Sequence, residues 1–570
     1  MTTRHLAATL GLVLLAAAPT AGQAPLTTTD SARHVLNRLG YGASPGQIDA
    51  VVHEGIRRWI DRQLAVRDPR DPGLALRERA YEVLNTPVRD MVVMHTDQLG
   101  RALKAQAAGL DSMRREQLQA SLREQRAAGG KKELRDLNGD LLSVTLLRAT
   151  DSDRQLAEVL ADFWTNHFNV FIGKGFDRAY FADYLEHTIR PNVLGRFEDL
   201  LIATAKSPAM LFYLDNTESV AEGTDMQARI AGRPGGAQHR AQRLTPRERF
   251  TGRSTPPRGQ AAGRQLDPAM VERIKQRMPK GINENYAREL MELHTLGVDG
   301  GYTQQDVGNV ARLLTGWGMD RRSGFAFRFL AAAHDQQAKT VLGVFFPAGH
   351  GEDEGLRLLT LLAENPATMH HVSAKLCARF VADDPPDGCV DDAVRAWKKS
   401  GGEIREVVRA IIYSPDFWAA ANVQSKVKTP LEYVVSAVRA VAGEPDSTPR
   451  LAQQVARLGQ PLFQRTTPNG YPETQTDWVN SGALLARMNF AVALAAGRLP
   501  GVTVDLDRVL PLTSDHAALV DGVNRALLAG AMSPRTRQTI LREIADLADP
   551  AAARSLAIGL AIGGPEFQRQ

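Results

Sequence analysis

The 570-residue chain contains only two cysteines, and aromatic residues make up just 6% of it. It has no Walker loop, dinucleotide-binding fingerprint or His-Glu-x-x-His motif. After the N-terminal segment, no apolar run is long enough to span a membrane. These absences exclude several common enzyme classes and predict a mature chain without a transmembrane segment.

The charge balance is mildly basic, with a formal net charge of +5. The arginines and lysines are scattered or concentrated in one loop, which is not the pattern of a nucleic-acid-binding face. We therefore expect no nucleic-acid partner. A chain of this length can bury a large core, and nothing in the sequence indicates an oligomeric state.

The N-terminus has the pattern of a secretory signal peptide over residues 1–24. Arg4 supplies a positive charge, residues 6–18 are apolar, and Gly22-Gln23-Ala24 is a small-x-small cleavage site. The sequence predicts export by a cleaved signal, followed by a periplasmic or extracellular location.

The cysteines, Cys377 and Cys389, lie at the end of one predicted helix and the start of the next. An oxidising compartment favours a disulfide between them. Two unpaired buried thiols are the alternative.

Helical periodicity dominates the mature chain and predicts a mainly all-α fold, a large multi-helix bundle with one small β-hairpin near residues 325–345. We divide it into an N-terminal helical part, a disordered low-complexity insert rich in Gly, Pro and Arg, a central part with two motif helices and the hairpin, and a C-terminal helical part. These parts cover residues 25–216, 217–267, 268–345 and 346–570.

The central part holds the densest group of polar side chains, between residues 281 and 318. On a helix, Asn285, Glu289 and Glu292 share one face, and Arg288 lies on its flank. His294 points almost opposite to the two glutamates. We expect this helix to end at residue 296, before Gly297. A glycine-rich turn follows, and then a second helix over residues 304–315 that begins with a capping box of Thr303 and Asp306.

Other polar residues stand out beyond this helix. Asp162, Asn166 and Asn169 share one helical face, whereas His167 lies among aromatic residues. His334 and Asp335 form the polar turn of the predicted hairpin. The loop before residue 490 contains Tyr471 and Trp478 and is typical of a binding surface.

Together, several of these segments resemble the bacterial DUF1800 family. They are RLGYGASP, DFWTNHFNVF, SPAMLFYLDN, NENYARELMELHTLGVDGGYTQQDV, KVKTPLEYV, PNGYPETQTDWV and the region from His334-Asp335 to Lys339-Thr340. The resemblance covers nearly all of residues 25–570 apart from the insert and suggests one domain. It implies export and a mostly helical fold, without an established reaction. It also suggests, by association, a co-encoded secreted partner that looks like a sulfatase or phosphatase.

Our first hypothesis is an exported metal-dependent, hydrolase-like enzyme. Glu289 and Glu292 would be metal ligands or an acid/base pair beside Arg288, because helical bundles build metal sites from carboxylates on buried faces. The remaining ligands of a divalent ion would be His167, His334 and Asp335. The residues expected to bind substrate are Asn283, Asn285, Asn216 and Trp478.

Two alternatives remain open. The glutamates can belong to a purely structural network that fixes helix packing. The protein can also be a non-catalytic periplasmic or cell-surface binding or assembly protein, with its groove near Trp478 and Tyr471. The readings differ in whether Glu289, Glu292 and His167 converge around a pocket or each find another partner.

Overall fold

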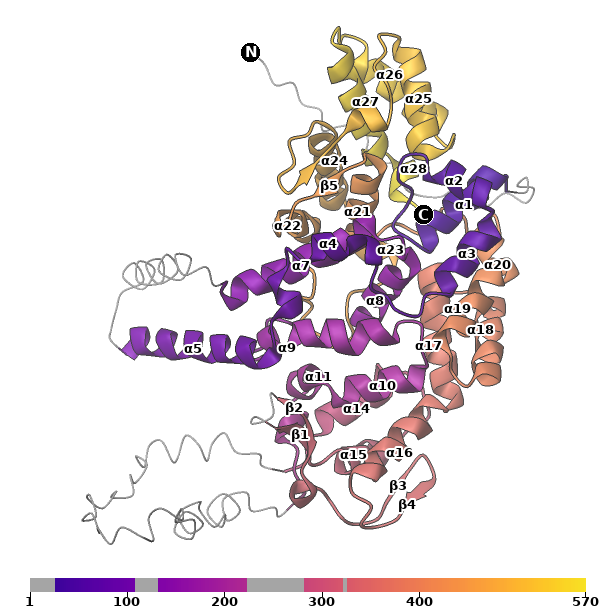
Figure 1. The fold of residues 1–570 in the computed structure, drawn as a ribbon. Coiled ribbons are helices and arrows are strands. Elements are labelled where there is room, and N and C mark those ends of the chain that lie inside the picture. Colours follow the sequence, from indigo (N-terminus) through magenta and orange to yellow (C-terminus); the bar gives the residue numbers. More distant parts are fainter. Residues whose placement is uncertain (1–25, 108–131, 223–280, 321–324) are drawn as a thin grey trace.

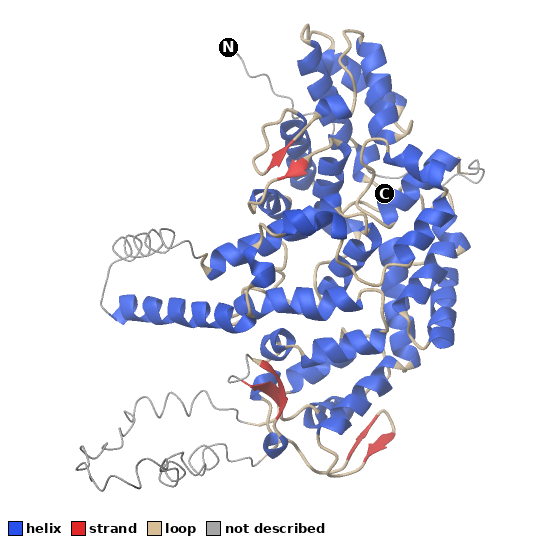
Figure 2. Cartoon of the chain, in the orientation of Figure 1, coloured by secondary structure: helices blue, strands red, loops and turns tan. Residues whose placement is uncertain are grey.

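Most of the chain folds into α-helices, which confirms the mainly all-α prediction (Figures 1 and 2). The computed structural model describes residues 26–107, 132–222, 281–320 and 325–570. The predicted signal peptide, residues 1–24, and residues 223–267 of the predicted insert lie outside the described residues. In the described part, no helix combines the length and apolar character that a membrane span requires.

Of the helices before the central part, α8 lies near the middle of the molecule (Figure 1) and packs against α3 and α7. The bounds of the helices before the central part are α1 Thr28–Arg38, α2 Gln47–Glu54, α3 Ile56–Leu64, α4 Ala75–Glu78, α5 Val88–Ala107, α7 Leu134–Asp151, α8 Gln155–His167, α9 Asp177–Asp183, α10 Phe197–Lys206 and α11 Pro208–Tyr213.

The central and C-terminal helices complete the fold. Their bounds are α14 Glu284–Glu292, α15 Gln304–Leu313, α16 Glu352–Ala363, α17 Pro366–Phe380, α18 Asp387–Ser400, α19 Ile404–Tyr413, α20 Pro415–Trp418, α21 Pro430–Ala440, α22 Arg450–Arg457, α23 Gln475–Trp478, α24 Ser481–Ala495, α25 His516–Leu528, α26 Pro534–Ile544, α27 Pro550–Gly563 and α28 Pro565–Gln568. One cluster of buried apolar side chains runs through the elements from α1 to α28.

Capping residues explain where the central helices begin. Asn283 caps α14 by accepting a hydrogen bond from the Asn285 backbone N–H, and Thr303 and Asp306 form the predicted capping box of α15. α14 ends at Glu292, earlier than the predicted end at residue 296, because the chain unwinds toward Gly297. Gly297 has a φ of +85°, a conformation that favours glycine.

The strands differ from the single predicted hairpin. β1 (Trp317–Asp320) pairs with β2 (Ala326–Phe329), and β3 (Lys339–Val341) pairs with β4 (Val344–Phe346), both antiparallel. The two predicted strands therefore belong to separate hairpins. β3 and β4 are joined by Leu342 and Gly343, both at positive φ, which suits a tight two-residue turn. A third, short pair joins β5 (Glu444–Pro445) to β6 (Val502–Thr503).

The start of the predicted insert belongs to the fold. Asn216–Glu218 forms a 3-10 turn, and Ser219 makes an isolated parallel β-bridge with Gly281. Residues 217–222 thus connect directly to the base of α14.

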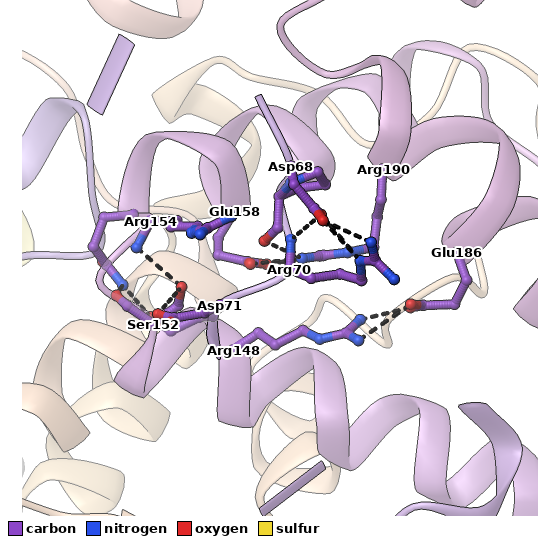
Figure 3. A network of polar contacts seen from close by, with 12 residues as sticks. Asp68, Arg70, Asp71, Arg148, Ser152, Arg154, Glu158, Glu186 and Arg190 are labelled. Carbon is purple, nitrogen blue, oxygen red and sulfur yellow. Dashed lines mark hydrogen bonds and ion pairs between the residues drawn. The ribbon is translucent and has the colours of Figure 1, made fainter. Parts of the chain in front are cut away.

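Buried ion pairs hold α8 in place (Figure 3). Arg148 of α7 donates to Glu186 and to Glu78, with N···O distances of 2.6 Å for both. Arg190 donates to both carboxylate oxygens of Glu158, at 2.7 and 2.8 Å. Glu158 lies on α8 and is nearly inaccessible, so this pair fixes the orientation of that helix.

The predicted disulfide is present. Cys377 of α17 and Cys389 of α18 are bonded, with their Cα atoms 6.2 Å apart. The bond ties α18 to α17, the helix that carries part of the cavity described below.

We expect a Cys377→Ala/Cys389→Ala variant to lose about 2–3 kcal/mol of unfolding free energy, because the bridge restricts the unfolded chain. Denaturant titration of both proteins measures the difference. Reductant should bring the wild type to the level of the variant and leave the variant unchanged. Equal midpoints for oxidised wild type and variant would contradict the prediction.

Candidate functional site

Glu289 and Glu292 lie on one half-buried face of α14 and influence each other. Burial raises the pKa of Glu289, and the charge of Glu292 adds to the effect. Arg288 does not bind either carboxylate: it donates to Gln304 at 2.9 Å and lies 3.7 Å from Glu284. The two glutamates therefore form a close acidic pair, with Arg288 directed toward α15.

The predicted substrate-binding amides of this region are occupied by backbone groups. Asn283 and Asn285 donate to carbonyl oxygens of the 214–215 turn, at 3.0 and 3.4 Å. Asn216 donates to carbonyls at the end of α15 and the start of β1, both at 3.2 Å. These side chains hold the turn, α14 and β1 together.

His167 faces away from the glutamates. It is 2% exposed, and its Nε2 lies 3.1 Å from the carbonyl oxygen of His294, the histidine on the opposite side of the α14 segment. Burial, with the nearby charge of Lys375, lowers the pKa of His294 to about 3. Helical geometry thus separates the histidines from the glutamate face.

His334 and Asp335 form a third environment. His334 Nδ1 lies 2.8 Å from the Thr315 carbonyl oxygen, and its Nε2 lies 3.4 Å from Glu354. Asp335 accepts from Arg312 at 2.8 Å. Both residues are therefore part of a buried polar junction beneath the hairpins.

The five predicted metal ligands, Glu289, Glu292, His167, His334 and Asp335, thus do not form one site. Across the described ranges, no group of three or more His, Cys, Asp or Glu residues is placed to hold a metal ion.

Trp478 supports a loop. Its side chain is 7% exposed, its indole N–H donates to the Pro472 carbonyl at 3.0 Å, and its ring packs against Tyr471 with centroids 6.0 Å apart. Trp478 therefore shapes the loop around Tyr471, which borders a polar cavity.

This cavity of about 30 Å³ has room for water-sized groups. It lies between α8, the end of α17, the start of α21 and the loop over residues 460–473. Its lining residues are Asp162, Thr165, Asn166, Asn169, Arg379, Thr429, Glu432, Gln460, Leu462, Phe463, Tyr471, Pro472 and Glu473.

Asp162 is an unpaired acid in the wall of the cavity. It lies one turn after Glu158 on α8, and within the described residues its carboxyl has no hydrogen bond or ion pair. Burial raises its pKa to about 7; the charges of Glu473 and Glu432 act in the same direction and Arg379 opposes them. Asp162 can thus hold or release a proton near neutral pH.

Glu432 has the opposite environment. Arg379 lies 2.5 Å from its Oε1, the Thr429 N–H donates to its Oε2 at 2.8 Å, and Gln570 donates at 2.9 Å. Burial alone would raise its pKa, but these donors hold it below its usual range. The cavity therefore brings together Glu432, which stays charged, and Asp162, which titrates near neutral pH.

Two asparagines attach the loop to α8. Asn166 donates to the Tyr471 carbonyl at 2.8 Å and accepts from the Tyr471 N–H at 2.6 Å, and Asn169 donates to the Thr467 carbonyl at 2.8 Å. Gly470 permits this approach: a Cβ there would lie 2.4 Å from the Asn166 carbonyl oxygen. The cavity wall is therefore firmly positioned.

Lys375 adds a second group that titrates near neutral pH. It lies on α17 one turn before Arg379 and is half-buried, without an ion pair in the described chain. Burial lowers its pKa to about 8, against the charge of Glu473. Perturbed acids and bases beside a cavity are a signature of functional sites.

The sequence identified part of this site. Asp162, Asn166 and Asn169 were predicted to share one helical face; all three line the cavity, but α8 ends at His167 and Asn169 follows it. Tyr471, in the loop predicted to be a binding surface, also lines the cavity. Lys375 and Arg379 were missed. The sequence feature that could have identified them is a pair of cationic residues one turn apart on a predicted helix face that also carries apolar residues.

A mainly helical protein with an acid–base cavity is the class that this fold and site define. The chain belongs to the DUF1800 family, described as a protein of unknown function, whose model matches residues 34–569. No curated protein and no solved structure matches it. Three of the segments that carry the family resemblance, DFWTNHFNVF, KVKTPLEYV and PNGYPETQTDWV, contribute residues to the cavity wall.

The raised pKa of Asp162 predicts a specific pH dependence of stability. Between about pH 4, near the unfolded value, and about pH 7, the native state keeps a proton that the unfolded state has released. The unfolding free energy of the wild type should therefore fall with rising pH in this window, relative to Asp162→Asn. Denaturant titrations at several pH values test this, and parallel curves for the two proteins would refute it.

Proposed function

We propose that the protein is an exported, hydrolase-like enzyme in which Asp162 transfers protons at the α8 cavity. The observation that carries the proposal is an unpaired carboxyl with a pKa of about 7 beside a carboxylate held charged by Arg379. A general acid or base works best when its pKa lies near the operating pH.

The surrounding groups suit hydrolysis. Asp162 can activate a water molecule in the cavity or protonate a leaving group. Lys375, half-buried one turn before Arg379 and in electrostatic interaction with the cavity residue Glu473, would stabilise negative charge that develops on a substrate oxygen. Arg379 already neutralises Glu432 and would mainly keep that carboxylate in place.

The proposed substrate lies outside the cytoplasm. This rests on the signal-peptide pattern of residues 1–24 and on the family resemblance. A co-encoded sulfatase- or phosphatase-like protein is a proposed partner on the same grounds, and makes esters the first substrates to test.

Metal dependence is a separate part of the proposal and is supported only by the acidic pair on α14. Glu289 and Glu292 are close and half-buried, and Glu289 has no hydrogen bond or ion pair to its carboxyl among the described residues. Two carboxylates can supply part of a divalent-ion site, with water or substrate as the other ligands.

A non-catalytic binding or assembly protein is the second candidate. It is favoured by the backbone partners of Asn216, Asn283 and Asn285, which show that much of the polar central region serves packing. On this reading, the cavity and its Tyr471 loop would bind a partner without turnover.

We expect Asp162→Asn to reduce kcat/KM by about 10²- to 10⁴-fold, the usual contribution of a positioned acid or base. Chromogenic carboxylic, phosphate and sulfate esters and glycosides would be screened with the wild type and then with the variant. Asp521→Asn, which changes a distant aspartate paired with Arg537, should retain full activity.

The Glu473→Gln variant separates a chemical from a structural role. Removing this negative charge lowers the pKa of Asp162, so the limb of the pH–rate profile that reports Asp162 should move to lower pH. An unchanged profile, or Asp162→Asn as active as the wild type on every substrate hydrolysed, would argue against Asp162 as the proton-transfer group.

Elemental analysis tests the metal part independently. If the acidic pair binds a metal, protein purified without chelator or nickel affinity should contain a stoichiometric ion that a Glu289→Ala/Glu292→Ala variant loses while remaining folded. Glu284→Ala, which changes a glutamate at the start of α14, is the matched control. Equal metal content in all three proteins would count against this pair as the ligands.

A further inference from the structure

A second small cavity, lined in part by Lys428 just before α21 and by Ser436 of that helix, contains a lysine without an ionic partner. Lys428 is 3% exposed, and in the described part of the chain no carboxylate lies within ion-pair distance of its Nζ. The Lys428 Nζ lies over the face of the Phe567 ring, 4.2 Å from the ring centroid. Buried lysines are nearly always paired, so this one calls for a specific explanation.

Lys426, two residues earlier, shows the usual arrangement. It is also buried, at 2% exposed, but its Nζ is paired with Asp383. The same strand-like segment therefore holds one paired and one unpaired buried lysine.

The charges around Lys428 are mostly positive. Burial lowers its pKa to about 7; Glu432 opposes this shift, whereas Arg33 and Arg487 add to it. Glu432 is already bound by Arg379. A substantial fraction of the Lys428 amine is thus uncharged near neutral pH, and a negative group at this position would be attracted by the arginines.

The volume of the cavity limits the size of a molecule that can reach the Lys428 amine. It measures about 30 Å³, and Arg33, Lys428, Glu566 and Arg569 are among its lining residues. This space admits a reactant of a few heavy atoms and not a metabolite-sized one. Glu566 uses Oε1 to accept from Ser533 and Thr536.

These observations favour a small electrophile that turns the amine into an anion. An aldehyde would give an imine, which carries a positive charge when protonated and would be repelled by the arginines. Carbon dioxide fits the cavity and gives a carbamate, whose negative charge suits them.

We propose that Lys428 is a carbamylation site that takes up carbon dioxide. The amine lone pair forms an N–C bond to the carbon, one C=O π pair moves to oxygen, and the nitrogen releases a proton to solvent. The reaction is R–NH2 + CO2 → R–NH–COO⁻ + H⁺, with no change of oxidation state. The carbamate would form charge-assisted contacts with the arginines near Lys428.

The test uses the full mature protein in ¹³C-labelled bicarbonate at mildly alkaline pH. Carbamates are trapped by methylation with trimethyloxonium, whose four heavy atoms suit the small cavity, and the peptides are analysed by mass spectrometry. We expect the trapped label at Lys428 to exceed that at the exposed Lys398 and Lys399 several-fold. Lys426, buried but paired, should remain unlabelled.

The lysines of the wild type act as internal controls, so the result does not depend on a variant that folds. Lys428→Arg provides a second check and should remove the label from this peptide. Absence of label at Lys428, or label no higher than at Lys398 and Lys399, would overturn the proposal and leave water as the occupant of the cavity. The readout is independent of any hydrolytic activity.

Discussion

The candidate site depends on the buried ion pair between Arg379 of α17 and Glu432 of α21. Both residues are nearly inaccessible, and their atoms lie 2.5 Å apart. Removing either one would leave an uncompensated buried charge, which typically costs 3–5 kcal/mol. Gln570, close to the end of the chain, also donates a hydrogen bond to Glu432. The ion pair therefore joins three distant parts of the sequence in one place.

That ion pair also explains why two carboxyls in one cavity behave differently. Glu432 has an arginine, an amide and a backbone N–H as donors, which together outweigh the cost of burial. Asp162 lacks such donors and faces the negative charges of Glu432 and Glu473. The division into a permanent anion and a titrating acid thus follows from hydrogen-bond supply, because Glu432, the more deeply buried of the two carboxyls, is the one that stays charged.

What the sequence could predict was local. The helices, the Thr303 capping box and the Cys377–Cys389 bridge depend on residues close together in the chain, and all three are confirmed. The prediction of a single hairpin was wrong, because each of the two predicted strands pairs with a different neighbour. β2 pairs with β1, and β3 pairs with β4. Glu289 and Glu292 were predicted as site residues because polar side chains are most dense in their part of the sequence. The cavity instead combines residues from α8, α17 and α21, and no periodic pattern links such distant segments.

The acidic face of α14 and the α8 cavity are nevertheless connected through Tyr213. Its hydroxyl donates to the Thr466 carbonyl at 2.9 Å, beside the loop that Asn169 holds. Burial raises the pKa of Tyr213 to about 12, an interaction with Asn169 opposes this, and the charge of Glu289 adds to it. A change of charge at Glu289 is therefore felt by a residue that supports the cavity wall.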